Sequence, residues 1–181
     1  RAMKPLIIEA YPELSELGAF RVLKGTLDET SYKRGAEVLE TPDGISYDLT
    51  LTNTGEGILL SGAASCTAHA SCARCLAPAT LEISGDVEGY YSLEPVDTLE
   101  GYEQDEFDCL DEDGKFDAAG PIEAALVYAT PFVILCKEDC KGLCPTCGAD
   151  LNEGPCACDS SDDIDPDNPF AVLRNLKFNE E

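Results

Sequence analysis

The sequence contains a single histidine, His69, among its 181 residues. A Ser/His/Asp or Cys/His catalytic arrangement would therefore have to use this residue. Its alanine neighbours are more typical of a core or surface histidine than of a metal ligand. The phosphate-binding patterns GxxxxGK[ST] and GxGxxG are absent, as is the DxDxDG frame of calcium loops. We therefore expect a protein that is not an enzyme and has no small-molecule substrate.

Long hydrophobic runs are also absent. No stretch approaches the roughly 18 apolar residues that a membrane-spanning helix needs, and the N-terminus shows no basic-then-apolar signal segment. The CxxC spacings in the chain favour a reducing compartment. The expected location is the cytoplasm, without membrane association.

Positive charge is scarce. The chain carries 12 Lys and Arg residues against 36 Asp and Glu residues, a formal net charge of −24. Nucleic-acid binding depends on Lys and Arg side chains that neutralise phosphates, yet the densest basic positions are only Lys33-Arg34 and the pair Lys137 and Lys141. We expect this field to repel RNA and to attract a basic protein, and ribosomal proteins are the commonest basic class in a cytosol. A simple role of the charge in solubility is an equally good interpretation.

Cysteine, by contrast, is abundant in one segment. Residues 136–158 hold six thiols in 23 residues: Cys136, Cys140, Cys144, Cys147, Cys156 and Cys158. The spacing of Cys144 and Cys147 suits a zinc knuckle, because the following Gly148 tolerates the positive φ that such a turn usually needs. The segment has almost no large apolar residues, so a metal would have to organise it.

Four thiolates in a tetrahedron satisfy Zn2+ and leave no open position, which marks a structural site. The expected ligands are Cys140, Cys144, Cys147 and Cys158, with Cys136, Cys156, Cys72 and Cys75 as alternates. Six candidates in the segment compete for four positions, so some are expected to remain free thiols.

The pair Cys72-Ala-Arg-Cys75 has two interpretations. It completes a metal site with cysteines from the C-terminal segment, or it is a redox-active CxxC motif. A redox motif needs a thiol at a helix N-terminus, which lowers its pKa, whereas this pair follows strand-like sequence and precedes Leu76-Ala-Pro78. The redox interpretation is the less favoured. No role is assigned to Cys109.

Alternation of apolar and polar residues predicts an antiparallel meander. The predicted strands cover residues 45–51, 58–70 and 81–91, with 21–27 as a weaker candidate. Residues 53–57, Asn-Thr-Gly-Glu-Gly, are a hairpin loop by composition. Cys72 and Cys75 then fall at or near a turn between two strands.

The second half of the chain predicts helices and acidic loops. Residues 92–117 carry eleven acidic residues against Lys115 alone, which is typical of a solvated, mobile loop. A helix follows, with Asp117 as its cap, Pro121 in its first turn and Pro131 after its end. An acidic linker after Cys158 leads to a two-turn helix that ends at Lys177. A helix this short is marginal alone, so it is expected to dock.

These signals predict an α+β protein: an antiparallel β-sheet, as a meander or partly closed barrel, with one or two packed helices and a small Cys-rich, zinc-ribbon-like lobe. The expected boundaries are residues 1–135 for the sheet domain with its acidic insert 92–117, 136–158 for the zinc lobe, and 159–181 for the linker and docking helix.

Three blocks of the sequence are distinctive in combination. The first is Cys72-Ala-Arg-Cys-Leu-Ala-Pro78. The second is the run from Cys136 to Asn152, together with Cys156-Ala-Cys158 shortly after it. The third is Asn168-Pro-Phe-Ala-Val-Leu-Arg-Asn-Leu-Lys177. In content and order they resemble the YceD family of large ribosomal RNA subunit accumulation proteins, over about the last two-thirds of the chain. The resemblance implies a cytosolic bacterial protein that supports synthesis, processing or stability of the large-subunit (23S) ribosomal RNA, in an accessory role with no known reaction. It also implies that the ribbon stabilises this cysteine-rich branch instead of carrying the activity.

Two main functional hypotheses follow. In the first, the acidic protein contacts a basic ribosomal protein or pre-ribosomal particle, so that ribosomal RNA is affected indirectly. In the alternative, it is a zinc-ribbon protein that binds the ribosomal RNA precursor directly through a patch near Arg74, Lys137 and Lys141. A redox or nuclease enzyme is a third hypothesis, which would need a depressed thiol pKa or a catalytic metal with an open site.

Overall fold

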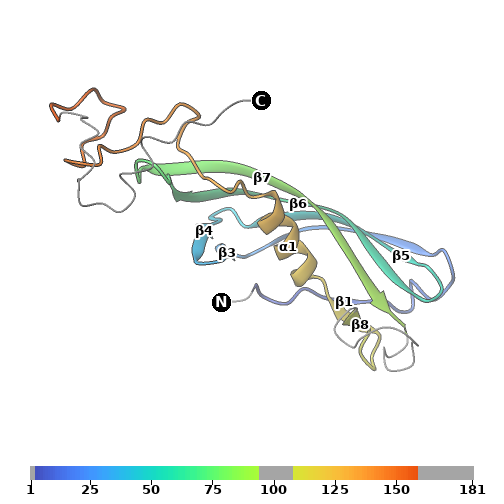
Figure 1. Ribbon diagram of the computed structural model, residues 1–181. Helices are drawn as coiled ribbons and strands as arrows, with labels where there is room; N and C mark the ends of the chain where they lie inside the picture. The colour runs from blue at the N-terminus through green and yellow to red at the C-terminus, as the bar shows by residue number, and fades with distance from the viewer. Residues whose placement is uncertain (1–2, 94–107, 159–181) are drawn as a thin grey trace, which may run out of the picture. The chain divides into compact units, whose positions relative to one another are not determined.

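The computed structural model describes residues 3–93 and 108–158 (Figure 1). The chain divides into two compact units, Arg1–Cys140 and Lys141–Glu181. The described part of the first unit is mostly antiparallel β-sheet with a single helix, and the sheet is not closed into a barrel. The predicted α+β class is confirmed. Of the two predicted forms, a meander or a partly closed barrel, the sheet is the open meander.

The centre of the sheet is the predicted meander. Strands β5 (Ile45–Asn53), β6 (Gly57–Ser71) and β7 (Pro78–Ser92) follow one another in the chain and pair antiparallel. Their side chains alternate between a buried and an exposed face, as period-two patterning requires, and the buried face includes Leu49, Leu60 and Val87. The ladder between β6 and β7 runs from Gly57↔Ser92 to Ser71↔Pro78 without a break in register.

Three further strands complete the other side of the sheet. Strand β2 (Phe20–Leu27) pairs with β5, which confirms the weaker strand prediction. Strands β3 (Ser31–Arg34) and β4 (Glu37–Glu40) form a hairpin. Because β7 occupies one edge of β6 along its whole length, β5 and β4 share the opposite edge, β4 through the pair Glu40↔His69.

Helix α1 (Ala119–Ala129) packs on the buried face of β7 and β6. The predicted helix is confirmed, with Pro121 in its first turn, but the N-cap is Ala118 and not Asp117. The Asp117 carboxylate nevertheless accepts a hydrogen bond from the Ala119 N–H at 2.9 Å. Close packing is possible because Gly85 of β7 has no side chain: a Cβ there would collide with the Ala125 carbonyl oxygen.

Residues 108–117, the C-terminal part of the acidic segment, contain two short strands and are not the mobile loop that the composition predicts. Strand β8 (Asp108–Cys109) pairs with the end of β7, and β9 (Lys115–Asp117) pairs with β1 (Ile7–Glu9). The prediction is wrong for these residues because apolar packing outweighs the local charge. Phe116 of β9 is buried against Tyr91, with ring centroids 4.1 Å apart.

The chain that leaves α1 is held by the β3–β4 hairpin. The Tyr32 hydroxyl lies 2.7 Å from the Thr130 hydroxyl. The Arg34 guanidinium donates to the carbonyl oxygens of Thr130, Pro131 and Phe132. Carbonyl groups at a helix C-terminus lack intrahelical donors, and a cation there also complements the helix dipole. The hairpin thus fixes the direction in which the chain runs toward Cys136.

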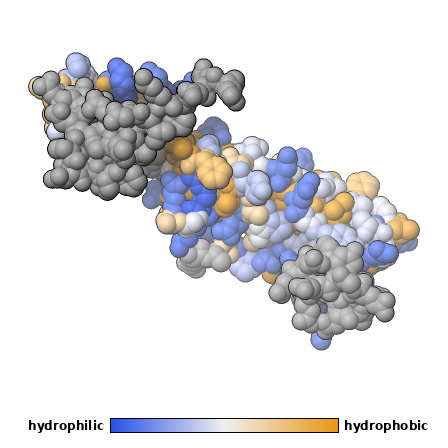
Figure 2. Space-filling model, in the orientation of Figure 1, coloured by the Kyte–Doolittle hydropathy of each residue, from blue (hydrophilic) through white to orange (hydrophobic). Residues whose placement is uncertain are grey.

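The predicted acidic linker and the C-terminal helix lie outside the described residues. Within residues 3–93 and 108–158, no helix is long and apolar enough to cross a membrane. Figure 2 shows hydrophobic residues in small patches between hydrophilic ones on the visible face.

The contact between α1 and the sheet yields the first prediction. Gly85→Ala should lower the free energy of unfolding by about 1–3 kcal/mol, because the added Cβ meets helix backbone and α1 must move. Gly120→Ala is the matched control: its Cβ meets nothing within 4 Å, and alanine should raise helix stability by up to about 1 kcal/mol. Denaturant unfolding of both variants measures the difference, and equal effects would contradict the packing described.

Candidate metal centres

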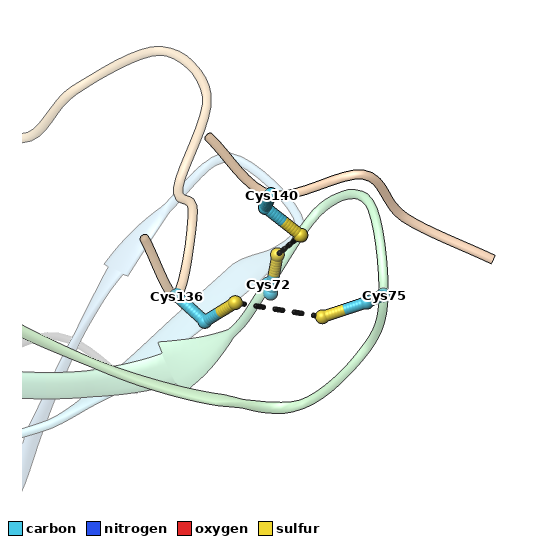
Figure 3. A group of neighbouring side chains, drawn as sticks. All are labelled: Cys72, Cys75, Cys136 and Cys140. Atoms are coloured by element: carbon cyan, nitrogen blue, oxygen red, sulfur yellow. Dashed lines mark hydrogen bonds between the residues drawn. The ribbon is translucent and has the colours of Figure 1, made fainter. Parts of the chain in front are cut away.

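The first candidate centre lies where β6 turns into β7. Cys72 and Cys75 come from this turn, and Cys136 and Cys140 come from the segment that follows α1. Figure 3 shows the sulfurs pointing toward one another. All four lie within 4.8 Å of one another, with 3.7 Å between Cys72 Sγ and Cys140 Sγ and 3.5 Å between Cys75 Sγ and Cys136 Sγ. Three of the four side chains are buried, and Cys136 is partly buried.

Hydrogen bonds beside the sulfurs join the two contributing segments. The Ala73 N–H donates to the Ile134 carbonyl at 2.8 Å. Arg74 Nη1 donates to the Cys140 carbonyl, also at 2.8 Å. The first CxxC pair is therefore held against the later pair by backbone and side-chain contacts as well as by sulfur packing.

The second candidate centre lies within the second unit. Cys144, Cys147, Cys156 and Cys158 place their sulfurs within 4.8 Å of one another. Cys144 is buried, Cys147 is exposed and the other two are intermediate. A short bridge between Leu143 and Asp150 closes the loop around the first pair. The described residues of this segment have little apolar packing of their own.

The two CxxC turns have the same backbone geometry. Cys72 N–H donates to the Ala77 carbonyl at 2.8 Å and Leu76 N–H to the Cys72 carbonyl at 3.0 Å. In the second turn, Cys144 N–H donates to the Ala149 carbonyl at 2.8 Å and Gly148 N–H to the Cys144 carbonyl at 2.9 Å.

The residue after the second cysteine has positive φ in both turns, +62° at Leu76 and +73° at Gly148. The turn expected at Gly148 is thus present in both CxxC segments. Leu76 adopts in the β6–β7 turn the conformation that Gly148 adopts after Cys147.

The sulfur separations test what these groups can hold. A disulfide needs about 2.05 Å between sulfurs, and none of the ten cysteines, all of which lie in the described residues, forms one. Four sulfurs at about 2.3 Å from a tetrahedral ion lie about 3.8 Å apart, close to the 3.5 and 3.7 Å measured in the first centre. Either group of four could therefore hold a metal ion.

The thiol pKa values depend on the backbone N–H groups and the neighbouring sulfurs around each cysteine. At Cys72, burial opposes ionisation, but the backbone N–H groups of Cys75, Arg74 and Cys136 outweigh it and lower the pKa to about 6. The backbone N–H groups of Cys147 and Thr146 lower the pKa of Cys144 to about 6. The neighbouring sulfur of Cys75 raises the pKa of Cys136 to about 12. Ionisation is therefore favoured at Cys72 and at Cys144, and a bound cation would favour it at a neighbour with a raised pKa such as Cys136.

The structure groups the sequence-predicted ligands differently from the single site expected. Cys144, Cys147 and Cys158 lie together in the second centre, whereas Cys140 lies in the first with Cys72, Cys75 and Cys136. None of the six cysteines of residues 136–158 is left outside a group of four. The sequence contained a usable signal, since the six thiols of this segment and the pair at Cys72 and Cys75 make two complete sets.

The remaining candidates lie elsewhere. His69 is an exposed residue of β6, and neither group includes it. Cys109 lies in β8, and Cys66 is a buried residue of β6 whose pKa is raised to about 11 by burial and by Glu82. Cys72 and Cys75 lie in a turn between strands and not at a helix N-terminus, so the helix that a redox CxxC motif uses is missing. The depressed thiol pKa that the redox interpretation also needs is present at Cys72, where, against the effect of burial, backbone N–H groups and not a helix lower it.

Comparison with known proteins identifies the family. A family model described as "Large ribosomal RNA subunit accumulation protein YceD" matches residues 60–177. The chain belongs to the YceD family. The match includes all eight cysteines of the two centres, so both lie in the part of the chain that the family shares.

Several mycobacterial relatives are similar, and all are uncharacterised. The chain is 31% identical to proteins of Mycobacterium tuberculosis and Mycobacterium bovis over 123 residues, which cover 67% of this chain and 59% of each relative. It therefore spans about three-fifths of the length of these relatives. A Mycobacterium leprae protein is 26% identical over 151 residues, 82% of this chain and 69% of the relative. No solved structure matches the chain significantly.

The unusual φ of Leu76 yields the second prediction. A non-glycine residue in this region costs about 1–2 kcal/mol, so Leu76→Gly should raise the free energy of unfolding by several tenths to about 1 kcal/mol after the entropy cost of glycine. The matched control is Leu17→Gly, because Leu17 is 76% exposed and has no positive φ. The control should lose stability in the same denaturation experiment. A loss of equal size in both variants would show that the turn is not strained.

Proposed function

We propose that the protein is a ribosome-biogenesis accessory factor that supports synthesis, processing or stability of large-subunit (23S) ribosomal RNA. It acts without a reaction of its own, through contacts with a basic ribosomal protein or a pre-ribosomal particle in the bacterial cytoplasm. Membership of the YceD family supports the ribosomal role, and the net charge of −24 is the observation that favours a basic protein partner. Groups of four cysteines without a disulfide suit a reducing compartment.

Direct binding to the RNA precursor is the alternative, and local contacts disfavour it. Of the three basic residues of the suggested patch, Arg74 already donates to the Cys140 carbonyl. Exposed Glu138 and Asp139 follow Lys137 directly, before Lys141. Phosphate binding needs several uncompensated cations in one place, so these acidic neighbours weaken the suggested patch.

We further propose that each group of four cysteines holds one structural zinc ion. Four thiolates complete the zinc shell and leave no position for a substrate, which agrees with a docking role. Zinc at Cys72, Cys75, Cys136 and Cys140 would tie the β6–β7 turn to the chain after α1. Zinc at Cys144, Cys147, Cys156 and Cys158 would supply most of the folding free energy of its short segment. We propose these sets in place of the mixed set Cys140, Cys144, Cys147 and Cys158.

Metal content separates these assignments. Protein purified without chelator should contain about two zinc ions per chain by elemental analysis, one for each group of four thiolates. Cys72→Ser and Cys147→Ser should each lose one ion, and the control Cys109→Ser should keep both. One ion per chain, lost equally in Cys140→Ser and Cys147→Ser but kept in Cys72→Ser, would instead support the mixed site.

Partner capture tests the functional proposal. Tagged protein should retain basic large-subunit ribosomal proteins from bacterial lysate after nuclease treatment, identified by mass spectrometry. The purified protein should give no gel shift with precursor ribosomal RNA at about 0.15 M salt, because its net charge repels phosphate. A shift that weakens steeply with salt, together with loss of the captured proteins after nuclease, would favour the RNA-binding alternative.

A further inference from the structure

Among the residues that the structure describes, few pair with the long outer edge of β7. β7 pairs with β6 along all of its 15 residues, but on its other side it pairs with β8 only at Tyr91 and Ser92. No strand in the described part of the chain pairs with the outer side of Pro78–Gly89. An edge of this kind presents N–H and C=O groups that can template another strand.

Edge strands are usually protected, and β7 lacks two of the common devices, a bulge and an internal proline. Its register with β6 shows no bulge, and its only proline is its first residue, Pro78. The exposed side chains of the edge are Thr80, Glu82, Ser84, Asp86 and Glu88. Three of these are acidic and none is basic, so the edge repels a second copy of this acidic chain and attracts a basic segment.

A groove runs between this edge and α1. It consists of two adjoining hollows of about 310 and 350 Å³ that share Asp86, Ala125 and Tyr128. Ser84 lines one hollow and Glu88 the other. Tyr128 is 95% exposed, and exposed aromatic side chains of this kind are frequent anchors in protein interfaces. In Figure 1, α1 runs beside β7, and the contact of Gly85 with the helix agrees.

We propose that this groove binds an extended, lysine- and arginine-bearing segment of a partner protein, which adds to β7 as a further strand. Main-chain hydrogen bonds to the edge would supply affinity. Glu82, Asp86 and Glu88 would pair with basic side chains on alternate positions, and Tyr128 would pack on the segment's aliphatic portions. The inference rests on the proposed function, because it specifies how a basic partner is recognised.

Two peptides of equal charge test strand addition. The first is a ten-residue peptide of alternating lysine and valine, and the second has proline in place of each valine. Proline lacks the N–H that a ladder needs, so the valine peptide should bind at least about tenfold more tightly, as measured by calorimetry at about 0.15 M salt. Equal affinities would reduce the interaction to ionic attraction and overturn the inference.

Charge-reversed variants locate the site. Asp86→Lys combined with Glu88→Lys should weaken binding of the valine peptide at least about tenfold, through lost attraction and added repulsion. Glu16→Lys combined with Glu56→Lys changes the net charge equally at exposed positions outside the groove and should bind within about twofold of the original protein. Equal weakening in both double variants would overturn the inference.

Hydrogen exchange tests the geometry. The valine peptide should slow exchange of β7 amides within Thr80–Gly89 and leave those of β2, another edge strand of the sheet, unchanged. Protection on β2 instead of β7 would overturn the inference. So would β7 protection that is present without peptide and disappears when residues 159–181 are removed, because the chain's own tail would then occupy the edge.

The variants also separate this inference from the proposed function. If the Asp86 and Glu88 double variant captures basic ribosomal proteins as well as the original protein does, the docking site is wrong and the function stands. If the valine peptide binds β7 as expected but no ribosomal protein is captured, the docking site stands and the proposed function fails.

Discussion

The ladder between β6 and β7 is the constraint on which the other features depend. Its fifteen pairs carry the chain from the β5–β6 hairpin to the turn that holds Cys72 and Cys75. One face of the ladder, with glycine at position 85, accepts α1 at close range. The helix in turn delivers the chain to Cys136. A shift of one residue in this register would exchange the two faces of β7. Gly85 would then no longer face α1, and Cys72 and Cys75 would no longer meet Cys136 and Cys140.

The two sulfur groups stand in different relations to the fold around them. The first joins residues 61 to 68 positions apart, from elements that are already packed in a hydrophobic core. An ion there would restrict a long loop of the unfolded chain, as any distant cross-link does. The second draws its ligands from a short segment with few buried apolar residues. An ion there would create local order instead of reinforcing it.

Much of this architecture could be predicted from local patterns. Alternation in residues 45–51, 58–70 and 81–91 is strong because one face of the sheet is buried, and Pro121 and Pro131 bracket the helix. The order around Phe116 could not be predicted, since it depends on a distant partner, Tyr91. The number of cysteines in the sequence allows two sets of four, but which cysteines form each set could not be predicted, because the first set depends on tertiary contacts. Proximity in sequence favours one cluster within residues 136–158, whereas the β6–β7 turn supplies Cys72 and Cys75, half of the first group.

Tyr32 and Arg34 show that the N-terminal region does more than extend the sheet. The family match begins at residue 60, yet these two residues lie before it and bind Thr130, Pro131 and Phe132 inside it. Residues outside the family match therefore hold part of the matched region in place, and in this sense they act as a bracket for it. A fragment trimmed to the family boundary would lose that bracket, and its helix end would fray at the approach to the first sulfur group.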